Sequence, residues 1–168
     1  MIHHTHHQTP IGGIRLRATD KGLLAIDHVN QQSSLDPASE ESPNHLILQQ
    51  AIAELDEYFA GNRQTFHTPL APTGTPFQLS VWEALKTIPY GETASYSDIA
   101  THISNPKAVR AVGAANGRNP LSIFIPCHRI IGKNGTLTGY AGGLDKKKIL
   151  LNLEQKTISS NDSFSLNL

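Results

Sequence analysis

The N-terminal part of the chain shows the alternation of apolar and polar residues that is typical of a strand. Apolar side chains occupy every second position over 14–18, with arginines between them. A turn at 20–22 (Asp-Lys-Gly) separates this run from a second apolar run over 23–29. Two extended runs joined by a short turn predict a β-hairpin.

A helical pattern follows the hairpin. Residues 30–42 are polar and predict a loop, and Ser42 with Pro43 predicts a helix N-cap followed by proline at the first helical position. The next apolar residues recur at helical spacing and form one stripe: Leu48, Ile52, Leu55 and Phe59. Gly61 stands where a glycine ends a helix. This part of the chain is therefore expected to form a small sheet-and-helix unit.

The segment over 67–76 contains three prolines and one glycine and is the best candidate for a linker. Beyond it, apolar residues at helical spacing predict helices over 75–85, 95–103, 106–116 and 145–155. The sequence thus predicts an α/β (α+β) chain. We expect an N-terminal α/β domain with linker over 1–74, a mainly helical domain over 75–156 and a polar tail over 157–168.

The composition restricts the class of protein. Of the 168 residues, 38% are apolar and 17% are charged, as in ordinary globular domains. No apolar run approaches the roughly 20 residues that a membrane span requires. The N-terminus has no basic stretch followed by an apolar one, so no secretory signal is expected. Cys127 is the single cysteine, which excludes an internal disulfide and a thiolate-rich zinc site and favours the reducing cytoplasm.

The net charge is zero, but the charges are unevenly distributed. Residues 1–74 carry four Lys and Arg against eight Asp and Glu, whereas residues 75–156 carry ten against five. A basic second half permits phosphate binding on one side of the molecule. A merely solvated, uneven surface fits the same count, so charge alone leaves nucleic-acid binding open.

The two central helices predict a winged helix-turn-helix-like DNA-binding element. They are joined by 104–107, and the second helix is rich in small residues: Ala108, Ala111, Gly113, Ala114, Ala115 and Gly117. Each glycine costs a helix roughly 1 kcal/mol relative to alanine. Close packing against another helix is one reason for such residues, and close approach to the narrow minor groove of DNA is another. Arg110 is the single long cation of residues 108–117 and could contact phosphate or stand in the space left by an extruded base.

The most informative stretch is Ile-Pro-Cys-His-Arg-Ile at 125–130. It places Cys127 on a proline-fixed turn with His128 next to it. A thiol becomes a strong nucleophile once it is deprotonated, and a nearby imidazole raises the thiolate fraction. A carboxylate would be needed to orient that imidazole. Glu154 is one candidate for this carboxylate; the alternative is that it caps or solvates the last helix, beside the lysines of 146–148. Two interpretations of Cys127 also stay open, a nucleophile and a buried structural thiol.

These motifs resemble those of the O6-alkylguanine-DNA alkyltransferases, also called methylated-DNA–protein-cysteine methyltransferases. The resemblance rests on Pro-Cys-His-Arg-Ile at 126–130, Arg-Ala-Val-Gly at 110–113, Asn-Pro at 119–120, Gly-Tyr-Ala-Gly-Gly at 139–143, and Glu154. It runs without gaps from Thr75 to Glu154 and is nearest to the stand-alone bacterial form. The N-terminal half agrees as a hairpin-and-helix unit.

The resemblance implies DNA repair by direct reversal. Such a protein binds duplex DNA through its helix-turn-helix in the minor groove and flips the damaged guanine out. It then transfers the alkyl group from O6 to its own cysteine in a single irreversible turnover, and the implication extends to O4-alkylthymine. The implied catalytic set is Cys127 as acceptor, His128 as a base acting through water, Glu154 orienting that histidine and Asn119 holding the turn that carries the cysteine.

The resemblance also implies a set of residues that bind the substrate and DNA: Tyr96, Arg110, Ala111, Gly113, Ile130, Tyr140 and Ala141. Arg110 is expected to fill the gap left by the flipped base, Tyr96 to help rotate the nucleotide, and Tyr140 to line the pocket. The carbonyls of Cys127 and Ile130 are expected to accept from the guanine amino group, and the backbone N–H of Ala141 to donate to the guanine oxygen. Ala141 stands where some relatives have serine, and Val109 where they have a smaller residue.

No cofactor, no metal and no obligate protein partner is implied, and the implied partner is double-stranded DNA that contains alkylated guanine. Relatives with a zinc site in the N-terminal half use cysteines that this chain lacks. Four histidines near the N-terminus need their own interpretation: His3, His4, His6 and His7. On an extended strand, two of these histidines lie on each face. We interpret them as plain surface side chains or adventitious metal ligands rather than as a functional metal site.

Two other functions stay open. One is a cysteine hydrolase that uses Cys127 and His128, which would regenerate its free thiol after each turnover. The other is a DNA-binding regulator without chemistry, for which the acceptor cysteine would have no purpose.

Overall fold

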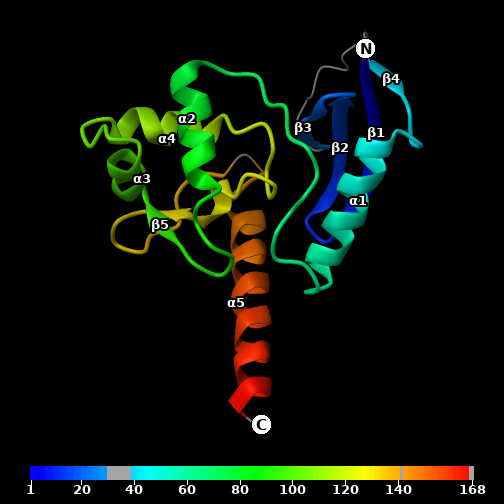
Figure 1. The fold of residues 1–168 in the computed structure, drawn as a ribbon. Helices are drawn as coiled ribbons and strands as arrows, with labels where there is room; N and C mark the ends of the chain where they lie inside the picture. Colours follow the sequence, from blue (N-terminus) through cyan, green and yellow to red (C-terminus); the bar gives the residue numbers. More distant parts are fainter. Residues whose placement is uncertain (30–38, 141, 167–168) are drawn as a thin grey trace. The chain divides into compact units, whose positions relative to one another are not determined.

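The computed structural model describes residues 1–29, 39–140 and 142–166, with side chains up to residue 160. The chain divides into two compact units, Met1–Thr73 and Gly74–Leu168 (Figure 1), and each has buried apolar residues of its own. Strands and helices are both present, so the predicted α+β class is confirmed. None of the described helices is long and apolar enough to cross a membrane.

A four-stranded sheet forms the first unit, in the order β3-β2-β1-β4. Its strands are β1 (Ile2–Thr9), β2 (Gly12–Thr19), β3 (Gly22–His28) and β4 (Ser39–Glu41). The predicted hairpin is confirmed: β2 and β3 pair antiparallel across the turn that precedes Gly22. β1 is antiparallel to β2, and β4 is parallel to β1.

Two strands of this sheet were not predicted. β1 has no apolar alternation, because its residues are mostly polar and Thr5 is its one buried position. The polar loop predicted over 30–42 is wrong for 39–41, which form β4; residues 30–38 lie outside the described residues. Three polar residues are too few to carry a periodic signal.

The helix α1 (Leu46–Phe59) packs against the sheet and contacts β1, β2 and β3 (Figure 1). Leu48 and Leu55, both on the predicted stripe, are completely buried, and so is Tyr58. The helix ends as predicted: Gly61 follows it with a φ of 78°, a left-handed conformation that glycine adopts without strain.

The predicted start of α1 at Ser42 and Pro43 is wrong. His45 is the N-cap and makes no side-chain capping bond. The Ser42 hydroxyl donates to the Glu40 carbonyl and is 2.8 Å from Nδ1 of His3, so these bonds to the strands replace a helix cap.

The helices α2 (Pro76–Leu85) and α3 (Tyr96–His102) of the second unit begin where the sequence predicts. Each begins with a capping box, formed by Thr75 with Gln78 and by Ser95 with Asp98. In both boxes the hydroxyl accepts from a backbone N–H three residues on, and the side chain there accepts from the N-cap N–H. The start of each helix is thus fixed by bonds between residues close in sequence.

The helix α4 (Val109–Gly117) begins at Val109 rather than at the predicted Pro106. The backbone carbonyl of Asn105 accepts from Ala108 N–H in a separate turn, and Ala108 becomes the N-cap. The connection between α3 and α4 is therefore longer than predicted, while the two helices still pack on each other. α2 packs on α4 as well, where Nε1 of Trp82 donates to a backbone carbonyl of α4 at 2.9 Å.

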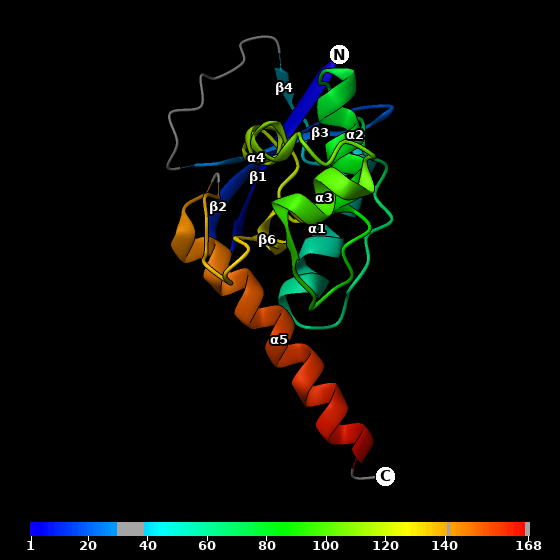
Figure 2. The same ribbon diagram turned by 90° about the vertical axis from the view of Figure 1, so that its left-hand side faces the viewer.

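The last helix, α5 (Leu144–Leu166), is longer than the predicted 145–155 and includes most of the predicted polar tail. No glycine or proline lies between 157 and 166, so no residue there ends the helix. Its last turns extend beyond the other elements of the second unit in both views (Figures 1 and 2).

The second unit contains a short pair of parallel strands. β5 (Ala94–Ser95) pairs with β6 (Ile130–Ile131). Because β5 leads directly into α3 and β6 directly follows Cys127–Arg129, this pair holds the start of α3 beside the predicted catalytic segment.

Candidate active site

Cys127 begins η1 (Cys127–Arg129), a single turn of 3-10 helix, and its side chain is buried. Its backbone N–H donates to the Ile125 carbonyl at 2.8 Å, and the Arg129 N–H donates to the Pro126 carbonyl at 3.0 Å. Every residue over 121–130 is buried. The thiol therefore lies inside the second unit and on a tightly bonded turn.

The segment that leads to Cys127 is fixed by Asn119. This buried side chain donates from Nδ2 to the Ile125 carbonyl at 2.8 Å and accepts at Oδ1 from Leu121 N–H at 3.0 Å. Between these two contacts, Ile123 has a φ of 77°, which is strained for a β-branched residue. Strained backbone persists where surrounding contacts hold it, and it is frequent beside active sites.

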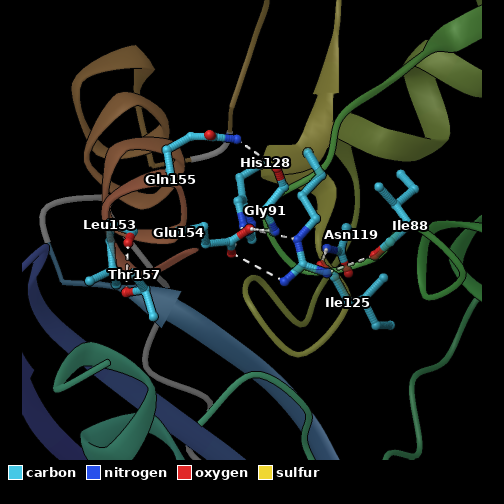
Figure 3. Close-up of polar contacts among 10 residues, drawn as sticks. Ile88, Gly91, Asn119, Ile125, His128, Leu153, Glu154, Gln155 and Thr157 are labelled. Carbon is cyan, nitrogen blue, oxygen red and sulfur yellow. Dashed lines mark hydrogen bonds and ion pairs between the residues drawn. The ribbon is translucent and has the colours of Figure 1, made fainter. Parts of the chain in front are cut away.

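His128 and Glu154 form a buried pair. Nε2 of the histidine lies 2.6 Å from Oε2 of the glutamate, and the two side chains are 0% and 1% exposed. Glu154 is on α5, so this contact joins the cysteine turn to the last helix (Figure 3). The interpretation of Glu154 as a solvated residue beside the lysines of 146–148 is therefore wrong.

Glu154 has two further partners. Oε1 accepts from Nε of Arg129 at 2.9 Å and from the backbone N–H of Gly91 at 3.1 Å, and Oε2 accepts from Nη2 of Arg129 at 3.1 Å. Burial by itself would raise the pKa of this carboxyl. The hydrogen bonds and charges of His128 and Arg129 outweigh that effect and lower the pKa of Glu154 to about 2. Glu154 is therefore a carboxylate at neutral pH.

The bond to Glu154 also fixes the tautomer of His128. A carboxylate can only accept, so Nε2 carries the hydrogen and Nδ1 keeps its lone pair. Nδ1 is buried and has no hydrogen-bond partner within the part of the chain that the structure describes. Burial lowers the pKa of His128, with Glu154 opposing the shift. The ring is thus neutral near pH 7 and has a free base nitrogen.

Tyr96 and Tyr140 lie near the cysteine turn. The Tyr96 hydroxyl is 2.6 Å from Oγ1 of Thr138, so the start of α3 is bonded to the loop that follows β6. Burial raises the pKa of Tyr140, and the neighbouring Cys127 adds to the shift. Ala141, the remaining residue predicted in this loop, lies outside the described residues.

The helix α4 presents a small, exposed face. Val112, Ala115 and Asn116 are buried against the neighbouring helices, whereas Arg110 and the small residues on the other side are exposed: Ala111, Ala114 and Gly117. A Cβ added at Gly113 would meet only the Tyr96 ring, at 3.7 Å. Packing against another helix therefore does not account for the exposed members of this set, Ala111, Ala114 and Gly117.

Comparisons with known proteins agree on one family. The family model "6-O-methylguanine DNA methyltransferase, DNA binding domain" matches residues 76–156, and the model "6-O-methylguanine DNA methyltransferase, ribonuclease-like domain" matches residues 2–72. The chain belongs to the 6-O-methylguanine DNA methyltransferase family. The resemblance that the sequence motifs suggested is thereby confirmed.

Relatives within this methyltransferase family match nearly the whole chain. A methylated-DNA–protein-cysteine methyltransferase of Methanosarcina acetivorans is 50% identical, over 88% of this chain and 94% of its own. The constitutive methylated-DNA–protein-cysteine methyltransferase of Bacillus subtilis is 49% identical, over 92% of this chain and 96% of its own. Among solved structures, Mycobacterium tuberculosis OGT in complex with DNA matches with a TM-score of 0.86 and 43% sequence identity. The match covers 92% of this chain and 94% of that chain.

Two residues of this methyltransferase site were not predicted from the sequence. Arg129 is part of the motif at 126–130, but no role was predicted for its side chain. It donates to Glu154, and its Nη1 donates to the Ile88 carbonyl at 2.8 Å. Lys147 is completely buried, and its Nζ donates to the carbonyls of Ile130 and Thr138. For Arg129 the available signal was a basic residue beside the apolar pair at 130–131, whereas nothing in the sequence distinguishes Lys147 from the lysines on either side of it.

The ammonium group of Lys147 favours the charged form of the Cys127 thiol. Burial raises the pKa of Cys127, while the Asn119 side chain and the Lys147 ammonium oppose the shift. Lys147 also occupies the Ile130 carbonyl, which was expected to accept from guanine; a carbonyl has two lone pairs and can accept from both. Deprotonating the thiol therefore requires a base, because the buried turn alone disfavours the thiolate.

Proposed function

We propose that this chain repairs alkylated guanine in duplex DNA by moving the alkyl group from O6 of the base to Sγ of Cys127. One observation carries the proposal: the residue next to the buried cysteine is a neutral histidine with a free base nitrogen, fixed by a buried carboxylate. A histidine held in this way is suited to take a thiol proton. The family relationship supports guanine as the substrate.

The proposed reaction is a displacement at the alkyl carbon. The thiol proton passes to Nδ1 of His128, directly or through one water, and Sγ attacks the carbon. The new S–C bond forms as the C–O6 bond breaks, and the electron pair stays on the base. The base takes up one proton from water, and His128 returns the thiol proton to water, so the protons balance. A thioether at Cys127 has no leaving route, so each chain reacts once. The same displacement serves O4-alkylthymine.

We assign the DNA contact to residues 75–156 of the second unit. The exposed face of α4, with Ala111 and Gly113, suits close approach to the minor groove, and Arg110 suits the gap left by an extruded base. Tyr96, Tyr140, Ala141 and the carbonyl of Ile130 are assigned to the pocket that receives the base. The cytoplasmic location expected from the sequence stays a prediction.

The other two functions are less well supported. A cysteine hydrolase or a regulator without chemistry would not account for the match to a methyltransferase family over both parts of the chain. We keep the hydrolase as an outcome of the test below, because it predicts more than one turnover per chain.

Intact-mass measurement tests the proposed function. After incubation with an excess of duplex DNA that contains one O6-methylguanine, each chain should gain one methyl group, and peptide mapping should place it on Cys127. Further incubation with fresh DNA should add nothing. Repair of more DNA than protein, with no mass gain, would instead establish a hydrolase.

Substitution of Arg110 separates base extrusion from alkyl transfer. Arg110→Ala should slow repair of duplex DNA by about tenfold or more, since the space left by the base is then unfilled and extrusion costs a few kcal/mol. Reaction with free O6-benzylguanine, which needs no extrusion, should stay within about twofold of wild type.

The matched control for this variant is Arg118→Ala, which removes an exposed arginine just after the end of α4. It should lower DNA affinity without a specific effect on extrusion, and that effect should be overcome at saturating DNA. If Arg110→Ala slows both substrates equally, or behaves as Arg118→Ala does, Arg110 has no role in extrusion.

A further inference from the structure

Three residues far apart in sequence meet on the first unit: His3 on β1, Asp20 in the turn between β2 and β3, and His45 at the N-cap of α1. One potential ligand atom from each lies within 4.8 Å of the other two. The rings of His3 and His45 are stacked with centroids 4.4 Å apart, and Nε2 of His45 is 2.9 Å from Oδ1 of Asp20. The group is independent of the cysteine chemistry of the second unit.

We propose that His3, Asp20 and His45 form a zinc-binding site that ties β1 and the β2–β3 turn to the start of α1. Two imidazoles and one carboxylate are a frequent ligand set for Zn²⁺, with water as the fourth ligand. Tetrahedral bonds of about 2.0–2.2 Å place ligand atoms roughly 3.3 Å apart. Pairs of ligand atoms must therefore approach one another by up to about 1.5 Å, and the side chain of Asp20, which is 92% exposed, is free to move.

The two histidine rings are restrained by contacts within the first unit. Nδ1 of His3 is 2.8 Å from the Ser42 hydroxyl, which fixes that ring and leaves its second nitrogen for a metal. The ring of His45 is only 13% exposed and is held in place by its stacking and by Asp20. The interpretation of all four N-terminal histidines as surface side chains thus does not extend to His3.

Strand geometry separates His3 from its neighbours in sequence. Odd positions of β1 face α1: Thr5 is buried, and His7 bonds Asp56 of that helix at 2.6 Å. Even positions lie on the other face, where the rings of His4 and His6 contact each other at 5.8 Å. The first unit therefore contains a second His–Asp pair, His7 with Asp56. Among the described residues, this pair has no third potential ligand close by.

Calorimetric titration with ZnCl₂ tests the site, using the full chain without a purification tag and with Cys127→Ser so that the thiol does not compete. We expect one ion per chain. Asp20→Asn and His3→Ala should each weaken binding by about tenfold or more, as expected for loss of a ligand. Zinc should also raise the unfolding temperature of the parent protein and not that of Asp20→Asn.

Two matched controls complete the experiment. Asp56→Asn removes the charge from the His–Asp pair that lacks a third ligand, and His6→Ala removes a histidine from the other face of β1. Both variants should bind zinc within about twofold of the parent. Asp20→Asn is the decisive variant, because its exposed side chain contributes little to folding. The proposal is overturned if Asp20→Asn and His3→Ala bind as the parent does, or if the two controls weaken binding equally.

Discussion

Cys127→Ser is expected to abolish alkyl transfer completely while leaving binding to duplex DNA intact. A serine hydroxyl is nearly isosteric with the thiol but a far weaker nucleophile at neutral pH, and its oxygen does not form the thioether that makes the reaction irreversible. The substitution lies in a buried, tightly bonded turn and not on the exposed face of α4, so the DNA contact should not change.

The measurement combines intact mass with fluorescence anisotropy on a labelled duplex. The variant should show no methyl adduct after prolonged incubation, with a dissociation constant within about threefold of wild type, a difference of less than about 1 kcal/mol. An adduct on the Cys127→Ser variant, or on another residue of wild type, would mean that Cys127 is not the acceptor.

His128→Ala should slow alkyl transfer by about a hundredfold or more, and Glu154→Gln by about ten- to a hundredfold. The first removes the nitrogen that takes the thiol proton. The second keeps the volume of the side chain but removes its negative charge. An amide can either donate to or accept from Nε2 of His128, so Nδ1 is no longer held in its unprotonated form. Glu92→Gln, at an exposed glutamate of the same unit, is the control and should keep the wild-type rate.

The pH profile separates a proton relay from a purely structural role. Burial lowers the pKa of His128 below 6.5, so the wild-type rate should persist below pH 6.5 and fall only as the histidine becomes protonated. His128→Ala should lack this inflection, and Glu154→Gln should shift it. If both variants retain the wild-type rate and profile, no relay exists and the thiol is activated by its turn alone.

Glu154→Gln should also destabilise the protein, by about 3–5 kcal/mol, because it leaves the buried guanidinium of Arg129 without its charged partner. The folded pKa of Glu154 is about 2, below the 4.5 of an unfolded glutamate, so its contribution to stability is present above about pH 5 and is lost as the pH falls towards 2. The difference in unfolding free energy between wild type and variant should therefore shrink in acid. Rates are compared at temperatures where both are folded.

Local patterns predicted those parts of the fold that local bonds determine. The starts of α2 and α3 were predicted correctly because each capping box is complete within four consecutive residues. The hairpin and the end of α1 at Gly61 were predicted correctly for the same reason. The start of α1 was predicted wrongly because Ser42, a good N-cap by type, bonds His3 instead, a residue distant in sequence.

The sequence by itself was enough to predict Cys127 as the nucleophile and His128 as its base, because the two are adjacent and their motif resembles that of one family. Only the tertiary structure brings together the groups that we propose activate them. Glu154 lies 26 residues from His128, and Lys147 lies 17 residues from the Ile130 carbonyl that it binds. His3, Asp20 and His45 likewise come together only when the sheet and α1 are packed. Charged and polar groups are paired across a core by the packing of whole elements, and spacing along the chain carries no record of that pairing.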